Sequence, residues 1–210
     1  MRLLLLGEGS SDQCLLPPLR WMVGRTTPAR VVVDWADMSI FETGKKLSDK
    51  VGACYQSYQP DLLFIHRDSD QQSPKLRYQE IAEAAQAIPH VPVVAIKAME
   101  TWLLHDEMAI RKAVGRPSGR EPLGLPRCSQ LEDVTDPKQV LKGALYQALN
   151  EQGRRRDRFD PDQAKRRVAD LVEDWSPLLA LTAIQQLQAD LVQALARLGL
   201  PICDGLSTSR

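Results

Sequence analysis

The sequences LLLLGEGSSD at residues 3–12 and LLFIHRDSD at residues 62–70 decide the fold class of this chain. Each begins with four consecutive apolar residues, which is typical of a short strand buried on both faces of a sheet. Each then continues into polar residues that include carboxylates. In an open parallel sheet the carboxyl ends of the strands line one crevice, so we expect Glu8, Asp68 and Asp70 to lie close together there.

Strands and helices alternate along the first half of the chain. Pro92 is tolerated in the last expected strand, whereas Pro17 and Pro18 should kink the first expected helix or delay its start. The further strands are expected at residues 31–33 and 91–96, and the helices at residues 12–24, 43–58 and 75–88. This alternation predicts an α/β protein with a mostly parallel, four-stranded, Rossmann-like sheet flanked by helices.

The composition changes after the fourth expected strand, where helical spacing replaces strand patterns. Residues 1–114 are expected to form the α/β domain, with a helix over residues 101–114 at its end. Residues 115–136 read as a loop or linker that is rich in Gly and Pro in its first part. Residues 137–206 are expected to form a C-terminal helical extension packed on the core. Its helices are expected near residues 140–149, 168–172 and 178–198.

The composition excludes several classes of protein. With 210 residues, 43% hydrophobic and 26% charged, the chain can bury a core and is not disordered. Lys plus Arg and Asp plus Glu both number 27, so any nucleic-acid binding must depend on a local cluster of charge. The cysteines lack metal-site spacing, and no apolar stretch is long enough for a signal peptide or a membrane span. We therefore expect a cytoplasmic protein with no membrane association.

Carboxylates follow three of the expected strands. Glu8 lies between two glycines, either as an exposed site residue or as an acid at a helix N-terminus. Asp68 and Asp70 point to the same side if the backbone between them is extended, although such residues are also common in solvated turns. Glu100 is a third candidate, and Asp106 either replaces it or caps the next helix. Clustered carboxylates repel one another, so this set favours Mg²⁺ or Mn²⁺ binding.

Basic residues near these acids are candidates for phosphate binding. Arg67 and Lys97 lie next to the expected strand ends, and the densest basic cluster includes Arg154, Arg155 and Arg156. The cluster either follows a phosphate backbone or is a solvated face balanced by nearby acids. His66 is interpreted as a structural residue because magnesium prefers oxygen ligands.

In order and spacing, GEGSSD, DSD and ETWLL (residues 100–104) resemble the TOPRIM domain of topoisomerases, primases and overcoming-lysogenization-defect nucleases. The chain is most similar to a prokaryotic family of small, uncharacterised TOPRIM-like proteins that continue into a basic helical half, as residues 138–167 do here. The resemblance implies that Glu8 is the general acid or base and that Asp68 and Asp70 hold Mg²⁺ or Mn²⁺. Glu100 would complete the metal shell.

The resemblance implies metal-dependent phosphodiester cleavage of nucleic acid, since neither a topoisomerase tyrosine nor a primase zinc module is evident. Arg67 departs from the family pattern and either binds phosphate or pairs with a carboxylate and weakens metal binding. A second hypothesis is that the protein is a non-catalytic subunit that partners an ABC-type ATPase in a phage-defence-like system. A third is a haloacid dehalogenase-type phosphohydrolase, because Asp68-x-Asp70 also resembles its nucleophile and acid.

Overall fold

The computed structural model describes residues 1–41, 44 and 46–205, apart from the side chain of Arg155. Its four strands form one sheet in the order β2-β1-β3-β4, and every neighbouring pair is parallel. The strands are β1 (Arg2–Leu6), β2 (Val32–Trp35), β3 (Leu62–Asp68) and β4 (His90–Ala95). The predicted α/β class with a four-stranded parallel sheet is therefore confirmed.

The apolar runs form strands because both faces of the sheet are covered. In β1, Leu3 and Leu5 belong to the core on one face. Leu4 and Leu6 belong to the core on the other face, and none of the four is more than 1% exposed. Leu6 pairs with Ile65, so β1 ends beside the middle of β3 and the polar turn after β1 runs alongside the end of β3.

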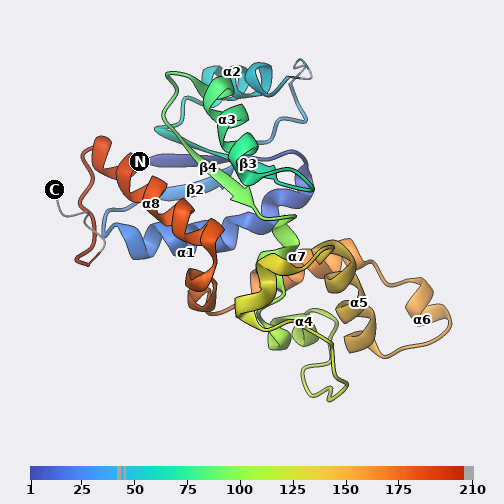
Figure 1. The fold of residues 1–210 in the computed structure, drawn as a ribbon. Helices are drawn as coiled ribbons and strands as arrows, with labels where there is room; N and C mark the ends of the chain where they lie inside the picture. The colour runs from blue at the N-terminus through green and yellow to red at the C-terminus, as the bar shows by residue number, and fades with distance from the viewer. Residues whose placement is uncertain (42–43, 45, 206–210) are drawn as a thin grey trace.

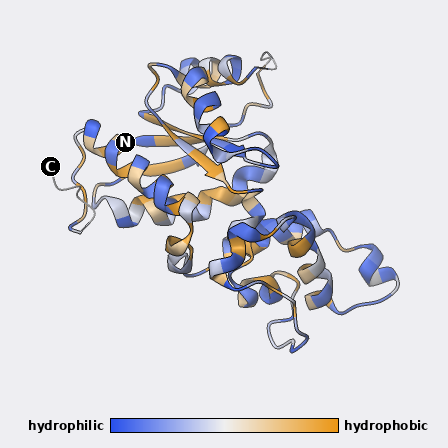
Figure 2. Cartoon of the chain, viewed as in Figure 1, coloured by the Kyte–Doolittle hydropathy of each residue, from blue (hydrophilic) through white to orange (hydrophobic). Residues whose placement is uncertain are grey.

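Helices cover the two faces of the sheet in separate layers (Figure 1). Helices α2 (Leu47–Tyr58) and α3 (Pro74–Ala85) lie on one face, and α1 (Leu16–Thr26) and α8 (Thr182–Arg197) lie on the other. Figure 2 shows hydrophobic residues gathered along the strands and on the helix faces that turn toward them. The expected delay before α1 is confirmed, because the 3-10 helix η1 (Ser10–Leu15) precedes it. The expected start of the second helix at Thr43 lies outside the described residues.

The remaining helices form a helical lobe beyond the carboxyl ends of the strands (Figure 1). The 3-10 helix η2 (Met99–Leu103) connects β4 to this lobe, which consists of the 3-10 helices η3 (Cys128–Asp133) and η4 (Ser176–Ala180), and of α4 (Glu107–Ala113), α5 (Pro137–Leu149), α6 (Arg154–Asp157) and α7 (Pro161–Leu171). The single helix expected over residues 101–114 is divided. Asp106 separates η2 from α4, because its Oδ1 accepts the Ala109 N–H at 2.9 Å and caps the second helix.

The last helix does not belong to this lobe. The chain leaves the sheet after β4, builds the lobe and returns through α8, which packs against β4 and α1. The helix expected over residues 178–198 is accordingly split, with η4 in the lobe and α8 on the sheet. Within the described residues, no helix is long and apolar enough to cross a membrane.

Candidate active site

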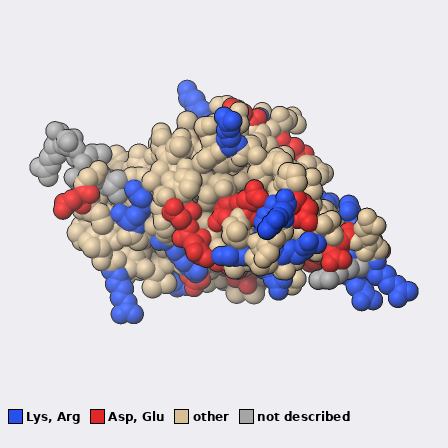
Figure 3. All heavy atoms as spheres, turned by 90° about the horizontal axis from the view of Figure 1, so that it is seen from below, with Lys and Arg blue, Asp and Glu red and all other residues tan. Residues whose placement is uncertain are grey.

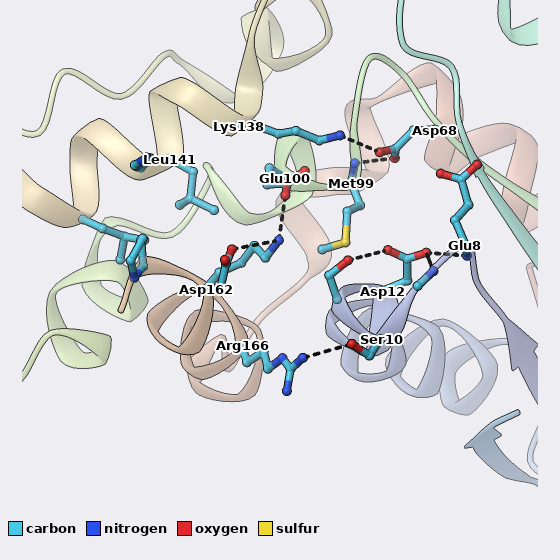
Figure 4. Close-up of a pocket in the computed structure, with 16 residues that line it drawn as sticks. Glu8, Ser10, Asp12, Asp68, Met99, Glu100, Lys138, Leu141, Asp162 and Arg166 are labelled. Carbon is cyan, nitrogen blue, oxygen red and sulfur yellow. Dashed lines mark hydrogen bonds and ion pairs between the residues drawn. The ribbon is translucent and has the colours of Figure 1, made fainter. Parts of the chain in front are cut away.

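An open cavity of about 750 Å³ separates the carboxyl ends of the strands from the helical lobe (Figure 4). The turn after β1, the end of β3 and η2 form one wall, and α5 and α7 form the other. Its acidic residues are Glu8, Asp12, Asp68, Glu100 and Asp162, and its basic residues are Lys138, Lys142, Lys165 and Arg166. Charge of both signs is thus concentrated in one place. Figure 3 shows a mixed distribution on the face that it views, where basic and acidic side chains lie side by side.

The turn after β1 fixes the position of Glu8. A Cβ atom on Gly7 would lie 2.7 Å from the ring of Trp35 and 2.8 Å from Asp12 Oδ2, so the turn requires glycine there. Asp12 is buried, and its Oδ2 accepts the N–H groups of Glu8 at 2.7 Å and Gly9 at 3.4 Å. Asp12 therefore organises the main chain that carries Glu8 to the edge of the cavity.

Two groups approach Oδ1 of Asp68, the Met99 N–H and the His66 ring. Asp68 is buried at the end of β3, and its Oδ1 accepts the main-chain N–H of Met99 at 2.8 Å. His66 Nε2 lies 3.3 Å from the same oxygen and 4.0 Å from Asp12 Oδ2. Because His66 Nδ1 lies 2.8 Å from the carbonyl oxygen of Val93, that nitrogen carries a proton. A second proton on Nε2 lets the ring donate toward the carboxylates, so the arrangement favours an imidazolium.

The pKa shifts of His66 and Asp68 agree with this arrangement. Burial opposes the charged imidazolium, but the hydrogen bond to Asp68 and the charges of Asp68 and Asp12 outweigh it and raise the pKa of His66. Burial likewise acts to raise the pKa of Asp68, but His66 and Lys138 outweigh it and lower that pKa. Burial raises the pKa of Glu8 despite the charge of Arg67 beside it. Of the two acids, Glu8 is therefore the better suited to accept and release a proton.

Glu100 forms the deepest contact between the two walls. It is 5% exposed, and its Oε1 lies 2.9 Å from Lys165 Nζ of α7. Burial acts to lower the pKa of Lys165, but the charge and hydrogen bond of Glu100 outweigh it and raise that pKa. The other oxygen, Oε2, is buried and has no hydrogen-bond partner among the residues that the structure describes. An unsatisfied carboxylate oxygen at this depth has free capacity for a proton donor or a cation.

Two further contacts join the helical lobe to the sheet side. Lys138 Nζ of α5 lies 3.3 Å from Asp68 Oδ2, and Arg166 of α7 donates to Ser10 Oγ at 3.4 Å (Figure 4). Most of the carboxylates therefore come from the sheet side, and the lysines and the arginine that line the cavity come from the lobe. The cavity exists only where these two parts of the chain meet.

The structure brings Glu8, Asp68 and Glu100 to this cavity, but it does not bring Asp70 there. Asp70 has a φ of 52°, so the backbone is not extended and the carboxylate turns away from Asp68. It is exposed and lies 3.3 Å from Arg77 Nη2. The two acids of the Asp-Ser-Asp sequence therefore have different surroundings.

Arg67, Lys97, Arg154 and Arg156 were predicted to bind nucleic acid but lie outside this cavity, whereas Lys165 and Arg166 of the same predicted basic cluster line it. Arg67 forms ion pairs with Glu8 and with Glu80, so it neutralises a candidate catalytic carboxylate. Lys97 has a φ of 65° in the turn after β4 and is not part of the cavity lining. Arg154 and Arg156 lie on α6, at the end of the lobe remote from the sheet (Figure 1).

The cavity carries the oxygen donors that Mg²⁺ and Mn²⁺ prefer. Glu8, Asp68 and Glu100 would hold such an ion, and Glu100 Oε2 has free capacity to do so. They are not assembled as a ligand set, however, since no group of three Asp, Glu, His or Cys side chains in residues 1–41, 44 and 46–205 is placed to hold a metal. Instead, each of the three has a basic partner. In donor type the site fits a divalent ion, which would replace these partners.

Sequence reasoning gave no site role to Asp12, Lys138 or Lys142. Asp12 belongs to the GEGSSD sequence, and its short separation from Glu8 in that sequence could have indicated that it lies at the site. The lysines of α5 carried no such signal, because only the docking of α5 on the sheet side brings them to the cavity.

Comparisons of the chain with protein-family models, with curated proteins and with solved structures find no match. The interpretation of the cavity therefore depends on its own geometry and chemistry.

Proposed function

We propose that the protein is a metal-dependent enzyme that cleaves phosphodiester bonds in nucleic acid, with its active site in the cavity between the sheet and the lobe. One observation carries the proposal. Glu8, Asp68 and Glu100 lie at or just beyond the carboxyl ends of three different strands, yet they line one cavity opposite a group of lysines. Carboxylates suit Mg²⁺ or Mn²⁺, and lysines suit phosphate, so the two walls together match a phosphate ester with its metal. The TOPRIM resemblance implies the same chemistry.

Each wall has a distinct role in this proposal. When bound, the metal would neutralise charge on the phosphate oxygens. Lys138 and Lys165, released from their carboxylate partners, would contact the substrate phosphate together with Lys142 and Arg166 of the same wall. Glu8 would transfer the proton, because burial raises its pKa. His66 would orient Asp68 from beneath, since its ring lies within 3.3 Å of that carboxylate.

Calorimetry with Mg²⁺ and Mn²⁺ on matched variants tests the proposal. Asp68→Asn should abolish metal binding, whereas Asp70→Asn should leave it unchanged, because Asp70 lies outside the cavity beside Arg77. Circular dichroism checks the folding of both variants. The wild type should also cleave single-stranded or duplex nucleic acid only when the metal is present. Absence of metal binding in the folded wild type, or equal loss in both variants, would refute the proposed site.

A second function is favoured by the ion pairs themselves. Arg67, Lys138 and Lys165 already neutralise Glu8, Asp68 and Glu100, respectively. A protein whose carboxylates stay paired in this way would serve as a non-catalytic subunit, and the ABC-type ATPase implied by the resemblance is the candidate partner. Folded protein that binds no metal but co-elutes with a neighbouring ATPase would support this function over the first.

A further inference from the structure

A second cavity, of about 590 Å³, adjoins the candidate active site along α5. Lys142 lines both cavities, so the two cavities adjoin each other at this side chain. The residues that α5 and its C-terminal end contribute to the second cavity are Gln139, Lys142, Gly143, Tyr146, Gln147 and Asn150. Their spacing of three and four residues places them on one face of the helix. The first cavity uses the adjacent face, with Lys142 at the border.

A glycine of α5 lines the second cavity. Gly143 lies inside α5, where glycine costs about 1 kcal/mol relative to alanine. A Cβ atom at this position would meet no atom within 4 Å, so neither close packing nor a positive φ requires glycine there. Gly143 is exposed and lines the second cavity, so a larger side chain there would occupy open space at the cavity wall.

Aromatic and cationic groups form one wall of this space. The Arg156 guanidinium lies over the Tyr146 ring, 4.9 Å from its centroid, and Phe159 contacts that ring edge-on with centroids 5.3 Å apart. Arg156 is exposed and Tyr146 is half-buried, so the stack is accessible from the cavity. Aromatic rings and arginine planes are the surfaces on which unpaired bases stack.

Amide side chains complete the lining. Gln139, Gln147 and Gln152 offer both hydrogen-bond donors and acceptors to a base edge. Asn150 is fixed, because its Nδ2 donates to Glu121 Oε1 at 2.5 Å. Glu121 also pairs with Arg111 and so anchors its loop to α4. The loop that contributes Glu121 and Pro122 to the cavity is therefore held in place.

We propose that this second cavity binds a nucleobase of single-stranded nucleic acid whose neighbouring phosphate lies in the candidate active site. The inference rests on the proposed function and deepens it by naming the form of the substrate. Lys142 would contact the phosphate between the two cavities, and the base would extend the stack of Tyr146 and Arg156. Lys142 and Tyr146 are one helical turn apart, about 6 Å along the axis, which lies within the reach of one nucleotide. Duplex strands would bind poorly, because their bases are not free to enter.

The test compares binding of two short fluorescein-labelled single strands, one of deoxyadenosine and one of equal length without bases. Fluorescence anisotropy is measured in chelator, so that metal-dependent cleavage does not occur. Wild type should bind the strand with bases about five-fold more tightly or better, as expected for one stacked base. Gly143→Leu should fill the cavity and bring this ratio close to one. Gly24→Leu is the matched control, because Gly24 is an exposed glycine of α1 with equal space around it.

The outcomes separate this inference from the proposed catalysis. An unchanged ratio in Gly143→Leu, equal binding of both strands by wild type, or no binding of either strand would overturn the base site. Cleavage with Mg²⁺ is measured independently on the same proteins. Wild type that shows the preference for bases but never cleaves would retain the base site and refute the nuclease. Wild type that cleaves but shows no preference would refute only the base site.

Discussion

The two walls of the candidate active site are built in different ways. On the sheet side, main-chain N–H groups hold short carboxylates, with Glu8 N–H bound to Asp12 and Met99 N–H bound to Asp68. On the lobe side, long side chains reach across from α5, and Lys138 is 55% exposed. Local backbone geometry therefore fixes the acids, whereas docking of the lobe places the bases. The acidic side chains are therefore preorganised, whereas the basic side chains of the lobe can exchange partners.

The largest expected effect tests whether the lobe-side cations are equivalent. Lys165→Met should destabilise the protein by about 3 to 5 kcal/mol, because it leaves Glu100 buried and unpaired. Lys138→Met should cost less than about 1 kcal/mol, because Lys138 is mostly exposed. Urea unfolding measures both free energies. Adding Glu100→Gln to Lys165→Met should recover part of the loss, and similar costs for the two lysines would contradict the distinction.

The next effect separates proton transfer on the sheet side from substrate binding on the lobe side. Glu8→Gln should lower kcat for phosphodiester cleavage by about 100-fold or more, because it removes a general acid or base. Lys142→Ala should raise KM, leave kcat nearly unchanged and weaken the salt dependence of binding, because it removes a phosphate contact. Steady-state kinetics at several salt concentrations measure both. A loss of kcat in Lys142→Ala equal to that in Glu8→Gln would remove the proposed division of roles.

A smaller effect on stability is expected when one glycine of each wall, Gly7 or Gly143, is replaced by alanine. Gly7→Ala should destabilise the protein by about 1 to 3 kcal/mol, because the new Cβ would overlap Trp35 and Asp12. Gly143→Ala should stabilise it by about 0.5 to 1 kcal/mol, because α5 gains helix propensity in open space. Thermal and urea unfolding should therefore move in opposite directions for the two variants. Destabilisation by Gly143→Ala would show that space at this position is restricted.

The smallest effect is the pH dependence of stability in metal-free protein. The raised pKa of His66 means that its contribution is complete below its unfolded pKa, about 6.5, and is lost as the pH rises through the folded pKa. The lowered pKa of Asp68 means that its contribution is present above its unfolded pKa, about 4, and is lost as the pH falls through the folded pKa. Stability from this pair should therefore be greatest between about pH 4 and 6.5. In Asp68→Asn, urea unfolding should show a smaller loss on the alkaline side, and an unchanged loss would exclude the pairing.

The sheet could be predicted from the sequence because its signals are local. Four-residue apolar runs before polar turns indicate buried parallel strands, and the structure has β1 and β3 at these positions. The division of the helix expected over residues 101–114 depends on the cap formed by Asp106, which the sequence offered as one of two alternative roles and the structure confirms. The return of α8 to the sheet was not accessible from the sequence, since an amphipathic helix does not specify which apolar surface it covers.

Some residues of the candidate site could likewise be predicted from local sequence, whereas others depend on tertiary packing. The strand-end rule brings Glu8 and Asp68 to one cavity, whereas Asp70 turns away at a single left-handed residue that the sequence does not specify. The partners of the carboxylates were not predictable, because Lys138 and Lys165 lie far from them in sequence and depend on how the lobe docks.

The return of α8 to the sheet also has a consequence for biosynthesis. The face of the sheet that carries Leu3 and Leu5 contacts α1 early, but its β4 side is covered by residues 182–197. A ribosome therefore completes the sheet and the whole lobe before the segment that covers β4 has emerged. The nascent chain must keep this apolar edge from other partners during that time, and chains truncated before α8 should be prone to aggregation.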